Sequence, residues 1–454
     1  MLLDINEVQD EAGRRYCLSN KSWQGGQGIV YLDQTGKFLI KVNSKDPLVR
    51  DRIRQQIRRV RQMPINDLPI TRPLELLRPP YAGYVMEYLT EMEPIKNLSW
   101  PPKGLDFVTW HIDTGGLKRR LLLLAKCAEV IYKLHSKGII YGDLSPNNVF
   151  VSAAVDHNQV YLIDVDNLTY ETNTSTSMIF TRFYGAPEVF KHERGVDSLT
   201  DAHSFAVIAF EVLALGHPLI GDMVASGEPQ LEDRALAGEF PWIFHCSDVR
   251  NVSSHVLPKE IFFSPRLFEL CQKTFEDGLT DRKKRPGIWD WVEKLYTAAQ
   301  FVLVCPNCHA SYYRDQEHCP WCKATLPDYM MIVVDVYTVN SDNSLVCVKK
   351  AITGCCLEHN QPLQLTRRMI GYGGENADHR ILEIEEIDQR IRVHSLDEGE
   401  YWITAPDWSL EKGFEQGRKE KIRRDRKSFS PRWQIHLGNI DKPHSVLRFF
   451  LNKG

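Results

Sequence analysis

The chain has 454 residues, more than one hydrophobic core normally organises, so two or three domains are expected. Its hydrophobic content of 43% and net charge of −3 are ordinary for a globular protein and exclude a strongly basic, nucleic-acid-binding character. No apolar stretch reaches the roughly 20 residues of a membrane-spanning helix, and the first residues lack the features of a signal peptide. We therefore expect a cytoplasmic protein that contacts neither membranes nor nucleic acid and keeps its cysteines reduced.

The first 90 residues have the pattern of short strands with one helix. The helix is predicted over residues 46–63, because Ile53, Ile57 and Val60 recur at helical spacing and Pro64 ends the pattern.

Residues further along the chain are mostly helical in pattern. Residues 117–137 form a predicted amphipathic helix, and two short apolar strands, 149–151 and 160–163, follow it. Residues 200–215 and 265–298 are again predicted to be helical. Strands first and helices afterwards predict an α+β fold with two lobes, about 1–88 and 89–300.

A glycine-rich segment and a lysine are the first candidate binding residues. Gly25, Gly26 and Gly28 lie in GGQGIVY, where a backbone without Cβ atoms can approach phosphate oxygens closely. Lys41 lies in the apolar run FLIKV, where its charge needs a partner such as the phosphates of a nucleotide. Each feature alone also fits an ordinary turn or a lysine on an edge strand.

Two carboxylates and an amide form a second group. Asp143 and Asn148 lie in YGDLSPNNVF after the long helix, and Asp164 ends the strand that contains LID. Phosphoryl transfer needs oxygen ligands for Mg²⁺ and a carboxylate that orients the attacking hydroxyl, and these three residues supply both. Their order and spacing resemble the protein-kinase superfamily, in which they match the catalytic-loop aspartate, the metal-binding asparagine and the D-F-G aspartate.

The resemblance covers roughly residues 10–300 and implies a bilobal protein-kinase-like fold that uses ATP with Mg²⁺ or Mn²⁺. Ala186-Pro187-Glu188 resembles the end of an activation segment, whose glutamate would pair with Arg285. Asp201 matches the aspartate that opens the central helix of the second lobe, and Thr181 stands where serine/threonine kinases place a threonine beside the catalytic aspartate.

The resemblance also implies a role for each candidate residue. Asp143, Lys41 and Thr181 would be catalytic, and Asn148 and Asp164 would bind the metal. The implied nucleotide-binding residues are Gly25, Gly26, Gly28, Val30, Lys41, Met86, Glu87, Tyr88, Leu89, Asn148 and Asp164, with Met86 as the gatekeeper of the hinge.

The sequence departs from the family pattern at several positions. Helix 46–63 has no glutamate to pair with Lys41, and Gln55 or Gln56 takes that position. Ser145 replaces a lysine that would stabilise the transferred phosphoryl group, and Asp164-Val165-Asp166 replaces D-F-G. An active serine/threonine kinase with a protein substrate and a nucleotide-binding pseudokinase scaffold both remain open. A small-molecule phosphotransferase is a third alternative, although the glycine-rich loop and Ala186-Pro187-Glu188 argue against it.

Two CxxC motifs predict a zinc ribbon over residues 301–327. Cys305, Cys308, Cys319 and Cys322 have the spacing of a tetrahedral Zn²⁺ site. Four sulfur ligands leave no open position, so the zinc would be structural and would supply the folding energy of this small segment.

Residues 328–454 alternate β-branched runs with turn residues and predict a small all-β domain. The order of kinase-like domain (1–300), zinc ribbon and β domain resembles bacterial kinases linked to tellurite-resistance and stress gene clusters. That resemblance implies a role in stress signalling, together with a von Willebrand A-type protein and a metal-dependent protein phosphatase.

Overall fold

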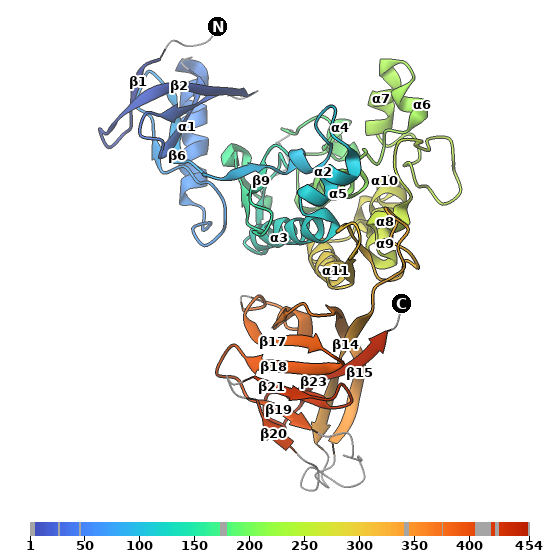
Figure 1. Cartoon of the computed structure of the whole chain (residues 1–454). Coiled ribbons are helices and arrows are strands. Elements are labelled where there is room, and N and C mark those ends of the chain that lie inside the picture. Colours follow the sequence, from blue (N-terminus) through green and yellow to red (C-terminus); the bar gives the residue numbers. More distant parts are fainter. Residues whose placement is uncertain are drawn as a thin grey trace. The chain divides into compact units, whose positions relative to one another are not determined.

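The computed structural model describes residues 5–25, 28–44, 47–172, 179–339, 345–374, 376–404, 419–422 and 426–452. The chain divides into two compact units (Figure 1). The first comprises Met1–Gly115 and Arg119–Leu295, and the second comprises Gly116–Lys118 and Tyr296–Gly454. Within the described residues, no helix is both long enough and apolar enough to cross a membrane.

An antiparallel sheet with the strand order β1-β2-β3-β4-β6-β5 forms the first lobe of the first unit. Its strands are β1 (Glu7–Gln9), β2 (Arg15–Gly25), β3 (Gly28–Asp33), β4 (Phe38–Ser44), β5 (Glu75–Leu76) and β6 (Ala82–Glu87). Helix α1 (Pro47–Gln62) lies within one residue of its predicted bounds.

Apolar side chains are buried on both faces of this sheet. On one face, Ile57 of α1 packs against Tyr84 and Met86. The other face has a separate cluster, which includes Ile40 and Val42. Because successive residues of a strand point to opposite faces, Lys41 of β4 lies on the α1 side of the sheet.

The second lobe is mostly helical and carries short strands. The strands are β7 (Met92–Pro94), β8 (Ile139–Ile140), β9 (Val149–Ser152), β10 (Val160–Leu162) and β11 (Thr169–Tyr170). The α-helices are α2 (Phe107–Asp113), α3 (Gly116–Ser136), α4 (Pro187–Phe190), α5 (Ser198–Ala214), α6 (Asp222–Ala225), α7 (Pro229–Leu236), α8 (Lys259–Phe262), α9 (Pro265–Gln272), α10 (Gly278–Thr280) and α11 (Ile288–Gln300). The shorter 3₁₀ and π elements are η1 (Ile95–Leu98), η2 (Val165–Asn167), η4 (Lys273–Asp277) and η5 (Arg282–Lys284).

Helix α5 is the buried centre of this lobe. A capping box starts it: the Asp197 carboxylate accepts from the backbone N–H of Thr200, and the Thr200 hydroxyl oxygen accepts from the backbone N–H of Asp197. Nearly all of its residues are buried, and its Phe205 packs edge-on against Trp291 of α11. The helix predicted over 200–215 is therefore a helix that is buried on all sides.

Residues 265–298 were predicted to be helical, but they do not form one continuous helix. The chain forms α9, the π-helical η4, α10 and the 3₁₀ helix η5 before α11 begins at Ile288. Pro286 lacks a backbone N–H and disfavours helical backbone in the residue before it, and Gly287 weakens a helix further. Residues 285–287 therefore separate two helical regions.

The second unit is rich in strands. The hairpin of β12 (Val302–Val304) and β13 (Ser311–Tyr313) lies within the cysteine-rich segment. A six-stranded sheet follows in the order β15-β14-β23-β22-β19-β20, and a four-stranded sheet has the order β16-β17-β18-β21. The strands are β14 (Tyr329–Val339), β15 (Leu345–Glu358), β16 (Leu363–Thr366), β17 (Arg380–Ile387), β18 (Arg390–Ser395), β19 (Tyr401–Thr404), β20 (Lys419–Lys421), β21 (Lys427–Phe429), β22 (Gln434–Leu437) and β23 (His444–Asn452).

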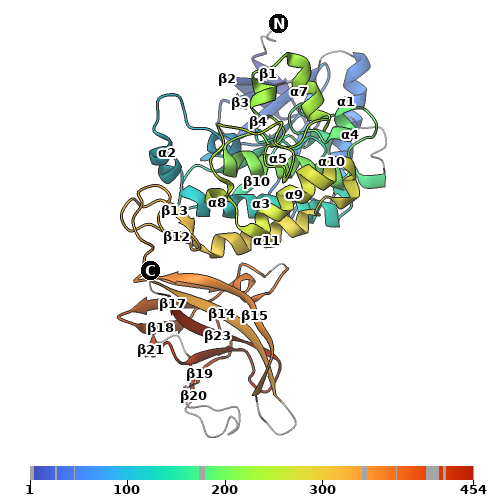
Figure 2. The ribbon, with the colours of Figure 1, turned by 90° about the vertical axis from the view of Figure 1, so that its right-hand side faces the viewer.

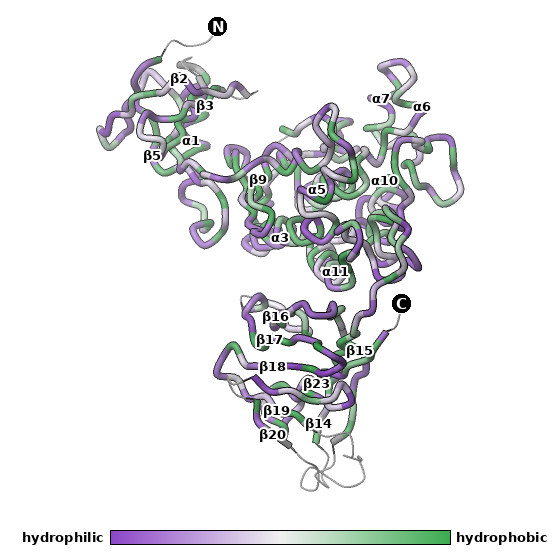
Figure 3. The backbone as a smooth tube through the Cα atoms, viewed as in Figure 1, coloured by the Kyte–Doolittle hydropathy of each residue, from purple (hydrophilic) through white to green (hydrophobic). Residues whose placement is uncertain are grey.

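The two sheets of the second unit share one hydrophobic core. Ile332 and Val334 of β14 meet Ile384 of β17 and Ile391 of β18 in this cluster. Figure 2 shows the long strands β14, β15 and β23 as neighbours, and Figure 3 shows hydrophilic and hydrophobic segments alternating along the strands of this unit. The alternation places one face of each sheet in the core.

Candidate functional site

A buried carboxylate forms hydrogen bonds with the backbone of the loop that follows α3 and β8. Asp201, in the first turn of α5, accepts hydrogen bonds from the backbone N–H groups of Tyr141 (2.8 Å) and Gly142 (2.9 Å). The ring of His135 lies 3.0 Å from the same carboxylate. Bonds to an ionised acceptor are stronger than neutral ones, so the backbone before Asp143 is fixed to the most buried helix of the lobe.

Three polar side chains contact Asp143, two of them at its carboxylate and one at its backbone carbonyl. Its Oδ1 accepts a hydrogen bond from the Thr181 hydroxyl at 2.8 Å, and its Oδ2 lies 3.4 Å from the amide nitrogen of Asn167. The Asn148 amide donates to the backbone carbonyl of Asp143 at 2.9 Å. The predicted proximity of Thr181 to Asp143 is confirmed, whereas Asn167 was not among the predicted site residues.

A hairpin brings Asp164 to Asn148. In the antiparallel pair of β9 and β10, Val149 lies opposite Leu162, and the N–H of Ile163 donates to the carbonyl of Asn148 at 3.0 Å. Asp164 follows directly with φ of 55°, in the left-handed region that aspartate tolerates better than most residues. Two residues that were predicted to bind a metal are therefore neighbours at the end of one hairpin.

Lys41 is buried and contacts two carboxylates. Its Nζ forms ion pairs with Asp164 and, at 2.8 Å, with Oδ2 of Asp166. Burial lowers the pKa of Lys41, but the charges of Asp166 and Asp164 outweigh this effect, so the pKa is raised and the amine stays protonated. Burial raises the pKa of Asp164, and Lys41 opposes that rise. The sequence suggested that Lys41 lacks its usual ionic partner, and the structure supplies a different one.

Helix α1 reaches this site through an amide. Gln56, and not the exposed Gln55, faces inward, and its Nε2 donates to the backbone carbonyls of Asp166 (3.1 Å) and Leu168 (3.0 Å). Asn43 of β4 donates to Oδ2 of Asp166 at 3.1 Å. Sequence reasoning missed Asp166 and Asn43, although the acidic residue in place of the D-F-G glycine was a signal.

The glycine-rich hairpin joins β2 to β3, and Gly25 pairs with Gly28. Gly26 lies outside the described residues. Gly28 has φ of 155°, and a Cβ atom there would lie 2.4 Å from the carbonyl oxygen of Val42. This glycine is therefore required by the close approach of β3 to β4, whatever else it binds. Val30 of β3 lies opposite Lys41 in the same pair of strands.

The predicted hinge begins at the end of β6. Met86 is buried and lies opposite Leu39, and Glu87 is the last residue of the strand. The backbone N–H of Tyr88 donates to the carbonyl of Lys37 at 3.1 Å, so this N–H is already paired within the protein. Leu89, which follows, is half-buried.

The predicted pair of Glu188 and Arg285 is confirmed. Arg285 donates from both terminal nitrogens to the two carboxylate oxygens of Glu188, each at 2.7 Å, and Arg282 adds a bond of 3.1 Å. Burial raises the pKa of Glu188, but the hydrogen bonds and charge of Arg285 outweigh burial and lower the pKa to about 2. The planar, bidentate geometry attaches the end of the 179–188 segment to the helical lobe.

A pocket beside this segment was not predicted from the sequence. Phe183, Tyr184, Glu211, His217 and Trp100 are among the residues that line it. The Tyr184 hydroxyl donates to Glu211 at 2.8 Å, and burial raises the pKa of Glu211 to about 7. The carboxyl group of Glu211 therefore lines this pocket, close to the segment that contains Thr181 and Tyr184.

A sheet lobe and a helical lobe that bring Lys41, Asp143, Asn148 and Asp164 together define a protein-kinase-like domain. Residues 117–297 match the protein kinase domain. The serine/threonine-protein kinase pkn2 of Myxococcus xanthus is 33% identical over 130 residues, which cover 26% of this chain and 16% of that protein.

Other curated relatives are also serine/threonine kinases. The probable serine/threonine-protein kinase nek3 of Dictyostelium discoideum is 26% identical over 159 residues, which cover 33% of this chain and 14% of that protein. The serine/threonine-protein kinase sck2 of Schizosaccharomyces pombe is 29% identical over 137 residues, with coverages of 27% and 21%. The chain thus spans between 14% and 21% of the length of these three relatives. These similarities support protein phosphorylation as the general chemistry of the first unit.

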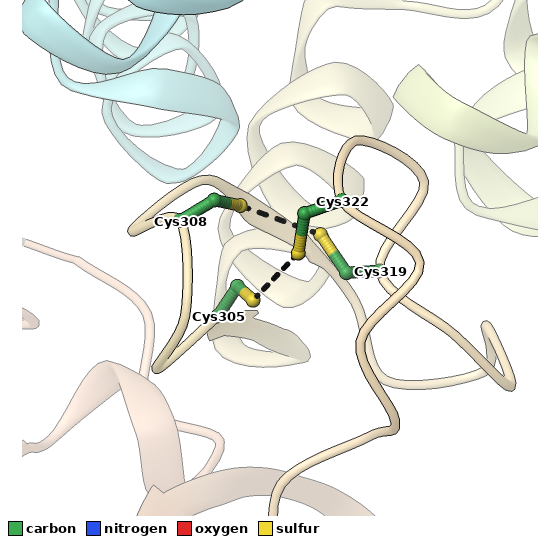
Figure 4. A group of neighbouring side chains, drawn as sticks. All are labelled: Cys305, Cys308, Cys319 and Cys322. Atoms are coloured by element: carbon green, nitrogen blue, oxygen red, sulfur yellow. Dashed lines mark hydrogen bonds between the residues drawn. The ribbon is translucent and has the colours of Figure 1, made fainter.

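The four cysteines of the second unit converge (Figure 4). Their sulfur atoms all lie within 4.8 Å of one another, and the pairs Cys305–Cys322 and Cys308–Cys319 are each 3.6 Å apart. Sulfurs at about 2.3 Å from a tetrahedral Zn²⁺ lie about 3.8 Å apart, so this donor set is compatible with zinc. Hydrogen bonding by the Asn307 side chain helps to lower the pKa of the Cys322 thiol to about 6, which favours its thiolate, whereas burial raises the pKa of Cys308 to about 12 and also raises that of Cys319.

Proposed function

We propose that the chain is a serine/threonine protein kinase that transfers the terminal phosphoryl group of ATP to a hydroxyl of a protein substrate. The observation that carries this proposal is the convergence of Asp143, Asn148, Asp164 and Lys41 from separate strands and loops. Phosphoryl transfer depends on positioned charges and oxygen ligands more than on covalent partners, and this set supplies both.

The oxygen donors of the site fit a magnesium ion. Asn148 uses its amide nitrogen on the carbonyl of Asp143, which leaves its amide oxygen available to a cation. The Asp164 side chain is 32% exposed, so one carboxylate reaches the open part of the site. Asn148 and Asp164 would hold the ion, which would supply positive charge to neutralise the transferred phosphoryl group.

Lys41 and Asp143 have distinct roles in this proposal. The Lys41 ammonium on β4 positions the phosphates of the nucleotide. Asp143 orients the acceptor hydroxyl and takes its proton, while the hydroxyl oxygen bonds to phosphorus and the bond to the ADP oxygen breaks. Thr181 already donates to this carboxylate and so holds it beside the acceptor.

Incubation of the full chain with γ-labelled ATP, Mg²⁺ and a generic protein acceptor tests the proposal. Asp143→Asn should reduce transfer at least 100-fold and change the dissociation constant for ATP by less than threefold, whereas Asp164→Ala should abolish Mg²⁺-dependent nucleotide binding. Asp335→Asn is a matched control, because Asp335 is a buried, arginine-paired carboxylate of the second unit and should leave both quantities unchanged.

Two outcomes would contradict a protein kinase and favour the alternatives. Binding of ATP without any transfer would favour a nucleotide-binding pseudokinase scaffold, for which the serine at 145 is the supporting observation. Consumption of ATP only when an amine or sugar-like acceptor is added would favour a small-molecule phosphotransferase.

We further propose a cytoplasmic role in bacterial stress signalling, with a von Willebrand A-type protein and a metal-dependent phosphatase as partners. Support comes from the resemblance of the domain order to tellurite-resistance-associated kinases. Phosphorylation of a purified von Willebrand A-type protein, and its reversal by the phosphatase, would test this. We also propose that Cys305, Cys308, Cys319 and Cys322 hold a structural zinc ion, on the basis of their sulfur–sulfur distances.

A further inference from the structure

The environment of Lys41 contains two carboxylates of different character. The Asp164 side chain is 32% exposed, whereas the Asp166 side chain is only 9% exposed and that of Lys41 is 5% exposed. Asp164 is a proposed metal ligand. A carboxylate that donates its lone pairs to a divalent ion is a weaker counter-ion for a neighbouring ammonium. If Asp164 binds the metal, Asp166 is the carboxylate that remains to pair with Lys41.

Asp166 depends on Lys41 in return. Its Oδ2 receives Lys41 at 2.8 Å and the Asn43 amide at 3.1 Å, and the carboxylate also interacts with the buried hydroxyl of Tyr84. A buried carboxylate that lacks its cation is strongly unfavourable. Lys41 and Asp166 therefore depend on each other, because both are buried and each is the counter-ion of the other.

Helix α1 has no acidic residue that replaces this carboxylate. Its only acid in the described helix, Asp51, is exposed and lies 3.5 Å from Arg50. The helix instead contacts the same short segment through Gln56, which donates to the carbonyl of Asp166. The backbone of residue 166 therefore anchors the helix while its side chain anchors the lysine.

We propose that Asp166 is the positioning residue that holds Lys41 for nucleotide binding, in place of a glutamate from α1. This inference rests on the proposed function, because it concerns the lysine that positions the phosphates. In kinases that pair this lysine with a helix glutamate, movement of the helix breaks the ion pair. In this chain the pair joins β4 to η2, so the charge partner of the lysine is not a residue of α1.

A double-mutant cycle on the full chain tests the inference. The dissociation constant for Mg²⁺-ATP is measured by calorimetry for the wild type, Asp166→Asn, Lys41→Met and the double variant. Asp166→Asn should weaken binding at least tenfold in the wild-type background and less than twofold in the Lys41→Met background, because Asp166 acts through Lys41. Equal effects in the two backgrounds, or wild-type affinity of Asp166→Asn, would overturn the proposal. Asp335→Asn is the matched control for neutralising a buried, paired carboxylate.

The outcome is separable from that of the proposed function. If the wild type binds ATP but transfers nothing, the kinase proposal fails and the binding cycle still decides the role of Asp166. If the wild type binds no nucleotide, the same four proteins are compared by their unfolding midpoints without ligand. Each single substitution should then lower the midpoint, and the double variant should fall no further than the worse single variant. Additive shifts would refute the pairing.

Discussion

Neutralising Glu188 is expected to destabilise the first unit by about 3 kcal/mol at pH 7. The folded carboxyl has a pKa of about 2 and the unfolded one its ordinary value of 4.5, and this difference converts to about 3 kcal/mol. Glu188→Gln keeps the shape but leaves the buried Arg285 without its charge partner, and breaking buried pairs in this way costs about 3–5 kcal/mol.

The pH dependence of this contribution has a definite sign. Because the pKa of Glu188 is lower in the folded state, the stabilisation is complete above the unfolded value of 4.5 and disappears as the pH falls through about 2. Between pH 7 and pH 3.5 the wild type should lose about 1.5 kcal/mol that Glu188→Gln does not lose. The difference between the two proteins should therefore shrink as the pH falls.

Urea unfolding of the full chain, followed by tryptophan fluorescence at both pH values, measures these quantities. Glu232→Gln is a suitable control, because Glu232 pairs with Arg182 on the surface and such pairs contribute about 0–1 kcal/mol. Two results would refute the reasoning: a loss below about 1 kcal/mol for Glu188→Gln at pH 7, or a difference that grows on acidification.

Two further outcomes are expected. The purified chain should contain one zinc ion, measured by elemental analysis, and Cys322→Ser should lower that content. A strong chelator should expose residues 301–327 to hydrogen exchange while α5 stays protected. Zinc-free protein in which residues 301–327 keep full protection would count against the site. Asp201→Asn should leave at least one of the Tyr141 and Gly142 N–H groups unpaired. The free energy of unfolding, measured in urea, should fall by about 1–3 kcal/mol, and phosphoryl transfer should fall more than the affinity for ATP. An unchanged transfer rate would show that Asp201 does not position Asp143.

Much of the candidate site was predictable because its residues lie in short motifs. Asn148 and Asp164 flank two consecutive strands, and any antiparallel hairpin of those strands brings them together. Thr181 and Arg285 were placed by the family resemblance, and their contacts with Asp143 and Glu188 are as expected. The helix over 46–63 followed from apolar spacing together with Pro64, which ends the pattern.

Other features depended on long-range packing. The break in the predicted 265–298 helix could have been read from Pro286 and Gly287, but the π-helical turn before it could not. The pocket at Glu211 arises where residues from several separate segments meet, and no local pattern marks it.

By itself, the sequence determined which chemical groups are present and how neighbouring strands and helices form, because spacing, turns and caps act over a few residues. Only the tertiary structure decided that Lys41 pairs with Asp166 and that Gln56 binds backbone carbonyls instead of the lysine. The physical reason is that the strength of a charge pair depends on distance and burial, and both are set by the packing of segments more than 100 residues apart.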